Sequence, residues 1–294
     1  MKWRVETYQL GSEAAVREEI LHTCDRANAG EILIFPEYAA YTADEAERTL
    51  DALVKKAQDR RVTIVTTLNL DGSLLPHSKP GHRYNALTLV TPRGELHVPG
   101  AKATPQSFEM VQYSERFPKI NVTPYDYIRG VTLIQGDETR SCVFSICSDL
   151  YVLLFGGPDY NDLRADIGIF PGNFGRGAEL AARRVISRLR TAGVFTETIF
   201  SNPLQLTKRP DQLPVVLPAR DHDTRTTPAI PLTDAERITL FRENVLFYVD
   251  ETVEHFVAMA ALTPMDNGRF TMPMSLIDAS PTLEYTDTPI DLNP

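Results

Sequence analysis

Short apolar runs alternate with amphipathic helical segments in the first part of the chain, and this order constrains the fold more than any other feature. Trp3–Leu10 alternates in polarity as a strand does, and Ser12–Asn28 has apolar residues on one helical face. Ile32–Phe35 is a continuous apolar run, typical of a buried parallel strand. A second helix over Asp44–Asp59 and a strand over Val62–Leu68 follow. The order β-α-β-α-β predicts a layered α/β fold.

Two hairpins are predicted further along. Arg83–Val90 and Glu95–Val98 flank a short turn that contains proline and glycine, and this pattern indicates paired strands. Val131–Gln135 and Cys142–Ile146 form a second hairpin, which leads directly to Cys147. We therefore expect each hairpin to deliver the chain to one end of a sheet.

The pattern weakens after residue 203. Strands over Ala165–Phe170 and Val194–Phe200 with a helix between them are predicted before this point, and the segment 203–231 then contains six prolines. Later expectations are a helix over Thr233–Asn244 and strands over Phe256–Leu262 and Phe270–Ile277. We expect a single domain over residues 1–277, with 203–231 as a divergent proline-rich segment, and a C-terminal tail over 278–294.

Composition excludes some classes of function. Hydrophobic residues make up 43% of the chain and charged residues 23%, as in soluble globular proteins. The net charge of -9 argues against binding to nucleic acid. Three cysteines do not form a disulfide framework, which indicates a reducing compartment. We found neither an apolar leader nor a run of transmembrane length, so we expect a cytoplasmic protein with no membrane association.

Three chemically complementary residues each stand just past a predicted strand: Glu37, Lys102 and Cys147. Strand ends on one side of a sheet converge, so these side chains are expected to meet in one pocket. A thiol needs a base or a cation nearby to become a nucleophile, a buried carboxylate can serve as that base, and an ammonium group can stabilise an oxyanion. A free cysteine taken alone is more often a core residue, and we expect Cys24 and Cys142 to be core residues.

The motifs around these three residues resemble those of the nitrilase (carbon–nitrogen hydrolase) superfamily. The matching stretches are Phe35-Pro-Glu37-Tyr38, Tyr84-Asn85, Lys102 after its hairpin, Ile146-Cys147-Ser148-Asp149 and Ser201-Asn202. Lys102 lies 65 residues after Glu37 and Cys147 lies 45 residues after Lys102, which is ordinary for that family. The resemblance covers about residues 1–203.

The resemblance implies a four-layer α-β-β-α sandwich with Glu37 as base, Lys102 as oxyanion-stabilising cation and Cys147 as nucleophile. The backbone amide after Cys147 would also hold the oxyanion. Glu109 is the candidate for a second glutamate that such proteins often carry, and Ser148 and Asn173 are expected around the triad or against the substrate. The resemblance implies no metal or organic cofactor. It also implies a small amide-type substrate and a homodimer or larger homo-oligomer.

Some positions depart from the family pattern. Ser148-Asp149 resembles the amidase and carbamoylase branch better than nitrilases proper, which usually have Trp-Glu there. The sequence therefore predicts a thiol-dependent hydrolase that cleaves a non-peptide C–N bond of a small amide or N-carbamoyl compound. Alternatives are a nitrilase proper or an N-acyltransferase on the same triad, and a non-catalytic binding or scaffold protein that keeps the sandwich.

Overall fold

The structure is a computed structural model. It describes residues 1–9, 11–105, 109, 120–150, 153, 163–174, 182–183, 185–187, 189–190, 193–203, 220–223, 263–264, 270–271 and 281–294. The expected helix over 233–244 and the expected strand over 256–262 lie outside the described residues. So does most of the stretch Phe108–Tyr127, whose irregular, aromatic-rich sequence makes it a candidate for the rim of the active site.

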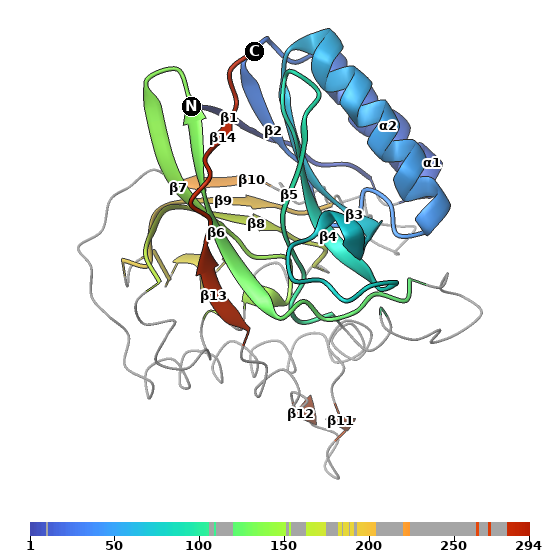
Figure 1. The fold of residues 1–294 in the computed structure, drawn as a ribbon, viewed down its shortest axis with the longest axis vertical. Coiled ribbons are helices and arrows are strands. Elements are labelled where there is room, and N and C mark those ends of the chain that lie inside the picture. Colours follow the sequence, from blue (N-terminus) through green and yellow to red (C-terminus); the bar gives the residue numbers. More distant parts are fainter. Residues whose placement is uncertain are drawn as a thin grey trace, which may run out of the picture.

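The first sheet has five strands in sequence order (Figure 1). They are β1 (Lys2–Val5), β2 (Glu31–Ile34), β3 (Thr63–Asp71), β4 (Arg83–Val90) and β5 (Leu96–Ala101). The first three strands are parallel, and β3, β4 and β5 are antiparallel. The β-α-β-α-β prediction and the first hairpin are therefore confirmed, although β1 ends at Val5 rather than Leu10.

Helices α1 (Glu13–Asp25) and α2 (Ala43–Arg60) cover one face of this sheet (Figure 1). The Ser12 side chain caps α1 by accepting from the N–H of Ala15. The buried residues of α1 include Val16, Ile20 and Cys24, so Cys24 belongs to the core as expected. A short 3₁₀ turn, η1 (Gly72–Leu74), follows β3. In the described part of the chain, neither helix is long and apolar enough to cross a membrane.

The second sheet has the strand order β10-β9-β8-β7-β6-β13, and β14 also pairs with β6. Its strands are β6 (Tyr127–Gln135), β7 (Glu138–Phe144), β8 (Ala165–Pro171), β9 (Phe195–Ser201), β10 (Arg220–Asp223), β13 (Thr282–Tyr285) and β14 (Ile290–Asp291). The β6–β7 pair is the second predicted hairpin, and β7, β8 and β9 run parallel. Strands β11 (Thr263–Pro264) and β12 (Phe270–Thr271) form a separate pair.

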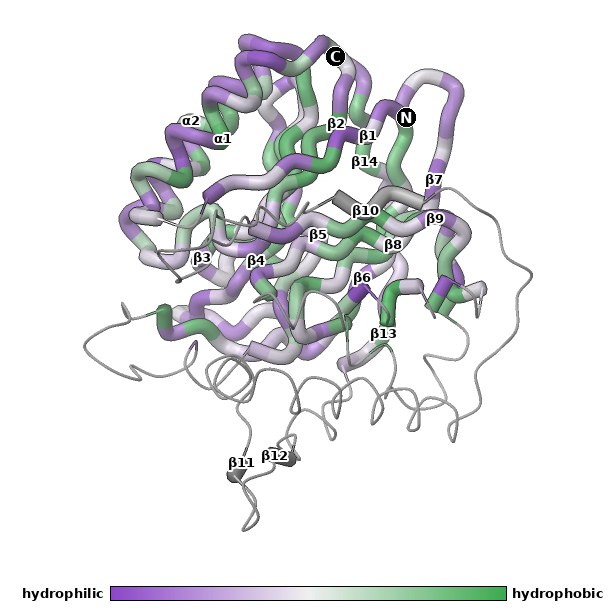
Figure 2. The backbone as a smooth tube through the Cα atoms, turned by 180° about the vertical axis from the view of Figure 1, so that it is seen from behind, coloured by the Kyte–Doolittle hydropathy of each residue, from purple (hydrophilic) through white to green (hydrophobic). Residues whose placement is uncertain are grey.

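The two sheets pack face to face. In β2, Ile32 and Ile34 belong to a core shared with second-sheet residues such as Ile167, while Leu33 belongs to the core beneath α1 and α2. Figure 2 shows hydrophobic residues concentrated in the strands of both sheets, with mixed polarity along the two helices. Helical residues Ala182, Val185, Ile186 and Leu189 belong to the core of the second sheet, and the neighbouring Arg183 guanidinium lies 5.1 Å from the ring centroid of Phe200. The four-layer α-β-β-α prediction is confirmed.

The C-terminal segment differs from the tail that we expected over 278–294. Strands β13 and β14 both pair in parallel with β6, and Leu292 is fully buried. The guanidinium of Arg93, in the β4–β5 hairpin, contacts the carboxylate of Asp291 at 3.1 Å. We expected a tail because this segment is acidic and contains proline. Composition does not show whether the main chain of a segment pairs with a strand, so these two strands were missed. Similarly, β10 lies within the proline-rich segment 203–231 and pairs with β9.

Candidate active site

Main-chain hydrogen bonds place Glu37 and Cys147 at the adjoining ends of the two sheets. Glu37 follows β2, and its N–H donates to the carbonyl of Gly172 at 3.0 Å. Cys147 follows β7, and its N–H donates to the carbonyl of Pro171 at 2.9 Å. Cys147 has a φ of 50°, a left-handed conformation that is uncommon for a residue other than glycine. Such strain at a turn is typical of functional sites.

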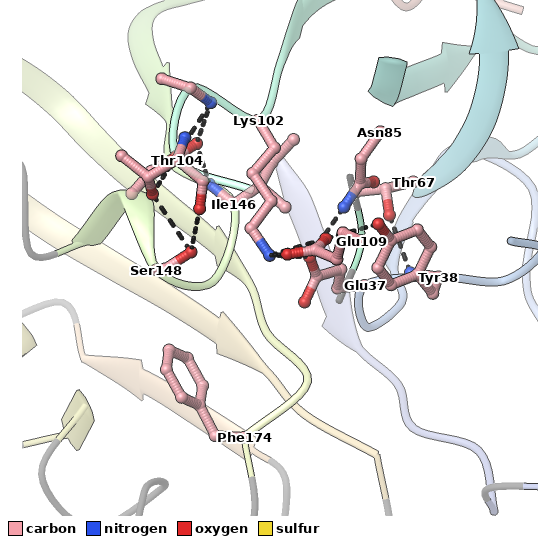
Figure 3. A network of polar contacts seen from close by, with 12 residues as sticks. Glu37, Tyr38, Thr67, Asn85, Lys102, Thr104, Glu109, Ile146, Ser148 and Phe174 are labelled. Carbon is pink, nitrogen blue, oxygen red and sulfur yellow. Dashed lines mark hydrogen bonds and ion pairs between the residues drawn. The ribbon is translucent and has the colours of Figure 1, made fainter. Parts of the chain in front are cut away.

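Lys102 carries the central positive charge of the site (Figure 3). It follows β5, and its Nζ donates to Glu37 Oε1 at 2.8 Å and to Glu109 Oε2 at 2.9 Å. All three side chains are nearly fully buried, with exposed fractions of 2% or less. Burial alone would lower the pKa of Lys102, but the carboxylates of Glu109 and Glu37 outweigh it and raise the pKa well above its ordinary value. Lys102 is therefore a permanent ammonium.

Two further side chains orient the carboxylates. Asn85 Nδ2 donates to Glu37 Oε1 at 2.7 Å, and the Tyr38 hydroxyl donates to Glu109 Oε1 at 2.5 Å. In the sequence both residues were visible only as members of the motifs Tyr84-Asn85 and Phe35-Pro-Glu37-Tyr38. Their side-chain roles depend on contacts between residues far apart in the chain, which no local pattern indicates.

The thiol of Cys147 lies close enough to Glu37 and Lys102 for both charges to act on it, and the backbone of Asn173 lies beside it. Burial and the negative charge of Glu37 raise the pKa of this thiol well above its ordinary value, although Lys102 opposes them. Burial also raises the pKa of Glu37, Lys102 lowers it, and Glu109 raises it again. A carboxyl group beside a thiol is the arrangement in which a base can take a proton as the nucleophile attacks.

Ser148 contributes its backbone. Its N–H has no hydrogen-bond acceptor among the described residues, while its hydroxyl donates to the carbonyl of Thr104 at 2.7 Å. An unused N–H beside a nucleophile, near the Lys102 ammonium, can stabilise a developing oxyanion. The structure thus brings together all six residues expected at the site: Glu37, Lys102, Glu109, Cys147, Ser148 and Asn173.

The other two cysteines are core residues. Burial raises the pKa of Cys24 to about 12. It also raises the pKa of Cys142, which lies in β7. Neither has the arrangement of base and cation that surrounds Cys147, so neither is activated.

Comparisons with protein families and with curated protein sequences give no match. Among solved structures, a carbon–nitrogen hydrolase from Helicobacter pylori G27 is similar, with a TM-score of 0.52 and 12% identity over 87% of this chain and 97% of the other. A carbon–nitrogen hydrolase superfamily protein from Xanthomonas campestris, with an arsenic adduct in its active site, has a TM-score of 0.49 and 11% identity over 83% of this chain and 93% of the other. An amidase from Nesterenkonia sp. has a TM-score of 0.48 and 15% identity over 82% of this chain and 94% of the other.

Of these three similarities, that to the Helicobacter protein exceeds a TM-score of 0.5 and extends over nearly the whole of that chain. At 12% identity, this similarity shows how the helices and strands are arranged and does not show which reaction the protein catalyses. The resemblance inferred from the sequence motifs is confirmed for the fold: the chain has the fold of the carbon–nitrogen hydrolase (nitrilase) superfamily.

Proposed function

We propose that this protein is a thiol-dependent hydrolase that cleaves a non-peptide C–N bond in a small amide or N-carbamoyl compound. The observation that supports this proposal best is the buried Lys102 ammonium held between Glu37 and Glu109, with the Cys147 thiol close to Glu37. Burying one ammonium and two carboxylates is costly, and apolar residues of similar volume would stabilise a core at least as well. Such clusters of perturbed groups are typical of active sites.

In the first half-reaction, Glu37 accepts the thiol proton as Cys147 Sγ attacks the carbonyl carbon. The carbonyl π electrons move onto oxygen, and the Lys102 ammonium and the Ser148 N–H stabilise the resulting oxyanion. The oxyanion then re-forms the carbonyl and the C–N bond breaks. Glu37 returns the proton to the departing nitrogen, so ammonia or an amine leaves and a thioester remains on Cys147.

In the second half-reaction, a water molecule replaces the departed amine. Glu37 accepts one of its protons while the water oxygen attacks the thioester carbon, and the same two donors stabilise the second oxyanion. When the C–S bond breaks, Glu37 returns the proton to sulfur. The sum is amide plus water giving a carboxylic or carbamic acid plus ammonia or an amine, with the enzyme unchanged.

The direct test is ammonia release from a panel of small aliphatic amides, N-carbamoyl amino acids and nitriles. We expect release from the amides or the N-carbamoyl compounds, and a loss of about 1000-fold or more in Cys147→Ala. Cys142→Ala, a change at another buried cysteine of the same hairpin, is the matched control and should leave the activity nearly unchanged. Release from the nitriles alone would instead indicate a nitrilase proper.

A second measurement does not require the substrate. Iodoacetamide at neutral pH should label Cys147 faster than Cys24 or Cys142, as read by mass spectrometry of peptides. Glu37→Gln should slow the labelling of Cys147, because the loss of the base that accepts the thiol proton outweighs the lower thiol pKa that follows from removing the charge. Fast labelling combined with acyl transfer to an added amine, rather than hydrolysis, would indicate an N-acyltransferase. If no compound of the panel releases ammonia and Cys147 is alkylated slowly, the result would favour a non-catalytic protein and contradict the proposal.

A further inference from the structure

Asp149 joins the turn that carries Cys147 to the turn that carries Lys102. Its carboxylate is 2% exposed and accepts hydrogen bonds on both oxygens. Oδ1 accepts from the N–H groups of Ala103 at 3.0 Å and Thr104 at 2.8 Å, and from the Thr104 hydroxyl at 2.8 Å. Oδ2 accepts from the N–H of Ala103 at 3.1 Å and the N–H of Ile146 at 3.3 Å. One buried carboxylate therefore binds donors from both turns.

These two turns belong to different sheets. Lys102 follows β5 of the first sheet, whereas Cys147 follows β7 of the second. The relative position of the ammonium and the thiol thus depends on how the sheets are held together at this end. The neighbouring Ser148 hydroxyl gives one more link, to the carbonyl of Thr104 at 2.7 Å. The Asp149 carboxylate accepts more hydrogen bonds across these two turns than the Ser148 hydroxyl makes. Its hydrogen bonds are also charge-assisted, which makes them stronger.

We propose that Asp149 is a positioning residue that fixes the Lys102 ammonium relative to the Cys147 thiol. This inference rests on the proposed function for the roles of those two groups. Asp149 acts through the backbone of residues 103, 104 and 146 and takes no part in proton transfer. Burial raises the pKa of Asp149 to about 6, while Lys102 and the donors from Thr104 and Ala103 lower it, so the group is ionised at neutral pH.

The test is the pH dependence of Cys147 alkylation in wild type and Asp149→Asn, with iodoacetamide as probe. The charged groups that face the thiol are Glu37, Lys102 and Glu109, and the Tyr38 hydroxyl lies beside them. Loss of a nearby negative charge would by itself lower the thiol pKa and speed alkylation. Displacement of Lys102 has the opposite effect, because the thiol loses the cation that favours its thiolate.

We expect the pH profile of Cys147 alkylation in Asp149→Asn to shift to higher pH by about one pH unit. The alkylation rate at pH 7 should then be about tenfold lower than that of wild type. A rate equal to or faster than that of wild type would overturn the inference. The matched control is Asp166→Asn, because the Asp166 carboxylate of β8 also accepts a backbone N–H and a hydroxyl, those of Ser141 in β7, at 2.8 Å and 2.9 Å, away from the site. Its profile should equal that of wild type.

If Asp149→Asn does not fold, as judged by circular dichroism, Thr104→Val decides the question. This change removes one donor to Asp149 without altering charge or shape much, and we expect a smaller slowing in the same direction. An unchanged rate in Thr104→Val would then overturn the inference. Once a substrate is found, kcat should fall up to about 100-fold in Asp149→Asn, with a much smaller change in KM. Alkylation that slows as described while no C–N bond is cleaved would support the positioning role and contradict the proposed hydrolase.

Discussion

The carbonyl of Gly172 accepts the backbone N–H of Glu37 at 3.0 Å, although the two residues extend strands of different sheets. The preceding carbonyl, that of Pro171, accepts the N–H of Cys147 at 2.9 Å. Two consecutive carbonyls at the end of β8 therefore hold the proposed base and the proposed nucleophile at once. The Gly172 N–H in turn donates to the carbonyl of Ser201 at 2.8 Å, which fixes this corner to β9.

Gly172 should not tolerate a side chain. A Cβ at this position would lie 2.7 Å from Phe174 Cδ2 and 3.0 Å from Phe200 Cε2, closer than carbon atoms pack. We expect Gly172→Ala to lower the free energy of unfolding by about 1–3 kcal/mol and to reduce kcat more than it raises KM. Urea unfolding and steady-state kinetics measure the two effects. Gly11→Ala is the control, because a Cβ there meets only Ala15 Cβ at 3.8 Å; equal behaviour of the two variants would contradict this account.

Tyr38 should act through Glu109. Its hydroxyl donates to Glu109 Oε1, which also accepts from Lys102 Nζ at 3.1 Å. Tyr38→Phe leaves this buried carboxylate without one donor, and we expect kcat to fall about tenfold. Tyr125→Phe is the matched control, because that hydroxyl donates to the carbonyl of Pro76 at 2.8 Å, outside the cluster. Similar kcat values for the two variants would argue against a role for the Tyr38 hydroxyl.

The pH profile of kcat/KM should have an acidic limb set by Glu37, which must be ionised to act as base. Because burial and Glu109 raise its pKa more than Lys102 lowers it, the limb should lie above the ordinary glutamate value of about 4.3. Activity is lost as the pH falls through this raised pKa.

The variant Asn85→Asp tests the assignment of that limb. It replaces the amide that donates to Glu37 at 2.7 Å with a second carboxylate. A second negative charge disfavours ionisation of Glu37, so we expect the acidic limb to shift to higher pH by about one pH unit or more. Asn85→Ser, which removes the donor without adding charge, should shift it less. If the acidic limb lies at the same pH in wild type, Asn85→Asp and Asn85→Ser, a group other than Glu37 sets it.

The C-terminal strands should contribute to global stability. Leu292 is fully buried, and its N–H donates to the carbonyl of Ile134 at 2.8 Å. We expect Leu292→Ala to lower the free energy of unfolding by about 2–5 kcal/mol, because the change leaves a cavity. The same truncation at Leu74, which is 46% exposed, should change it by less than about 0.5 kcal/mol. Urea unfolding curves of both variants give the comparison.

Much of the site was predictable because its residues stand at strand ends. The apolar runs Ile32–Phe35 and Cys142–Ile146 mark the strands, and Glu37 and Cys147 follow them directly. The orienting roles of Tyr38, Asn85 and Asp149 were not predictable, because each depends on a partner dozens of residues away. The cytoplasmic location, the single domain over residues 1–277 and the homo-oligomer stay predictions.

For about the first 200 residues, the sequence by itself determined the order of most strands and helices, and which reactive side chains follow them, because apolar periodicity and turn residues are local properties of the chain. The tertiary structure alone decided that Gly172 holds Glu37, that Asp149 binds the Lys102 turn, and that β13 and β14 pair with β6. The physical reason is that each of these contacts uses a backbone N–H or carbonyl group on at least one side. Nearly every residue carries both groups, so their pairing over long distances has no signature in the amino-acid sequence.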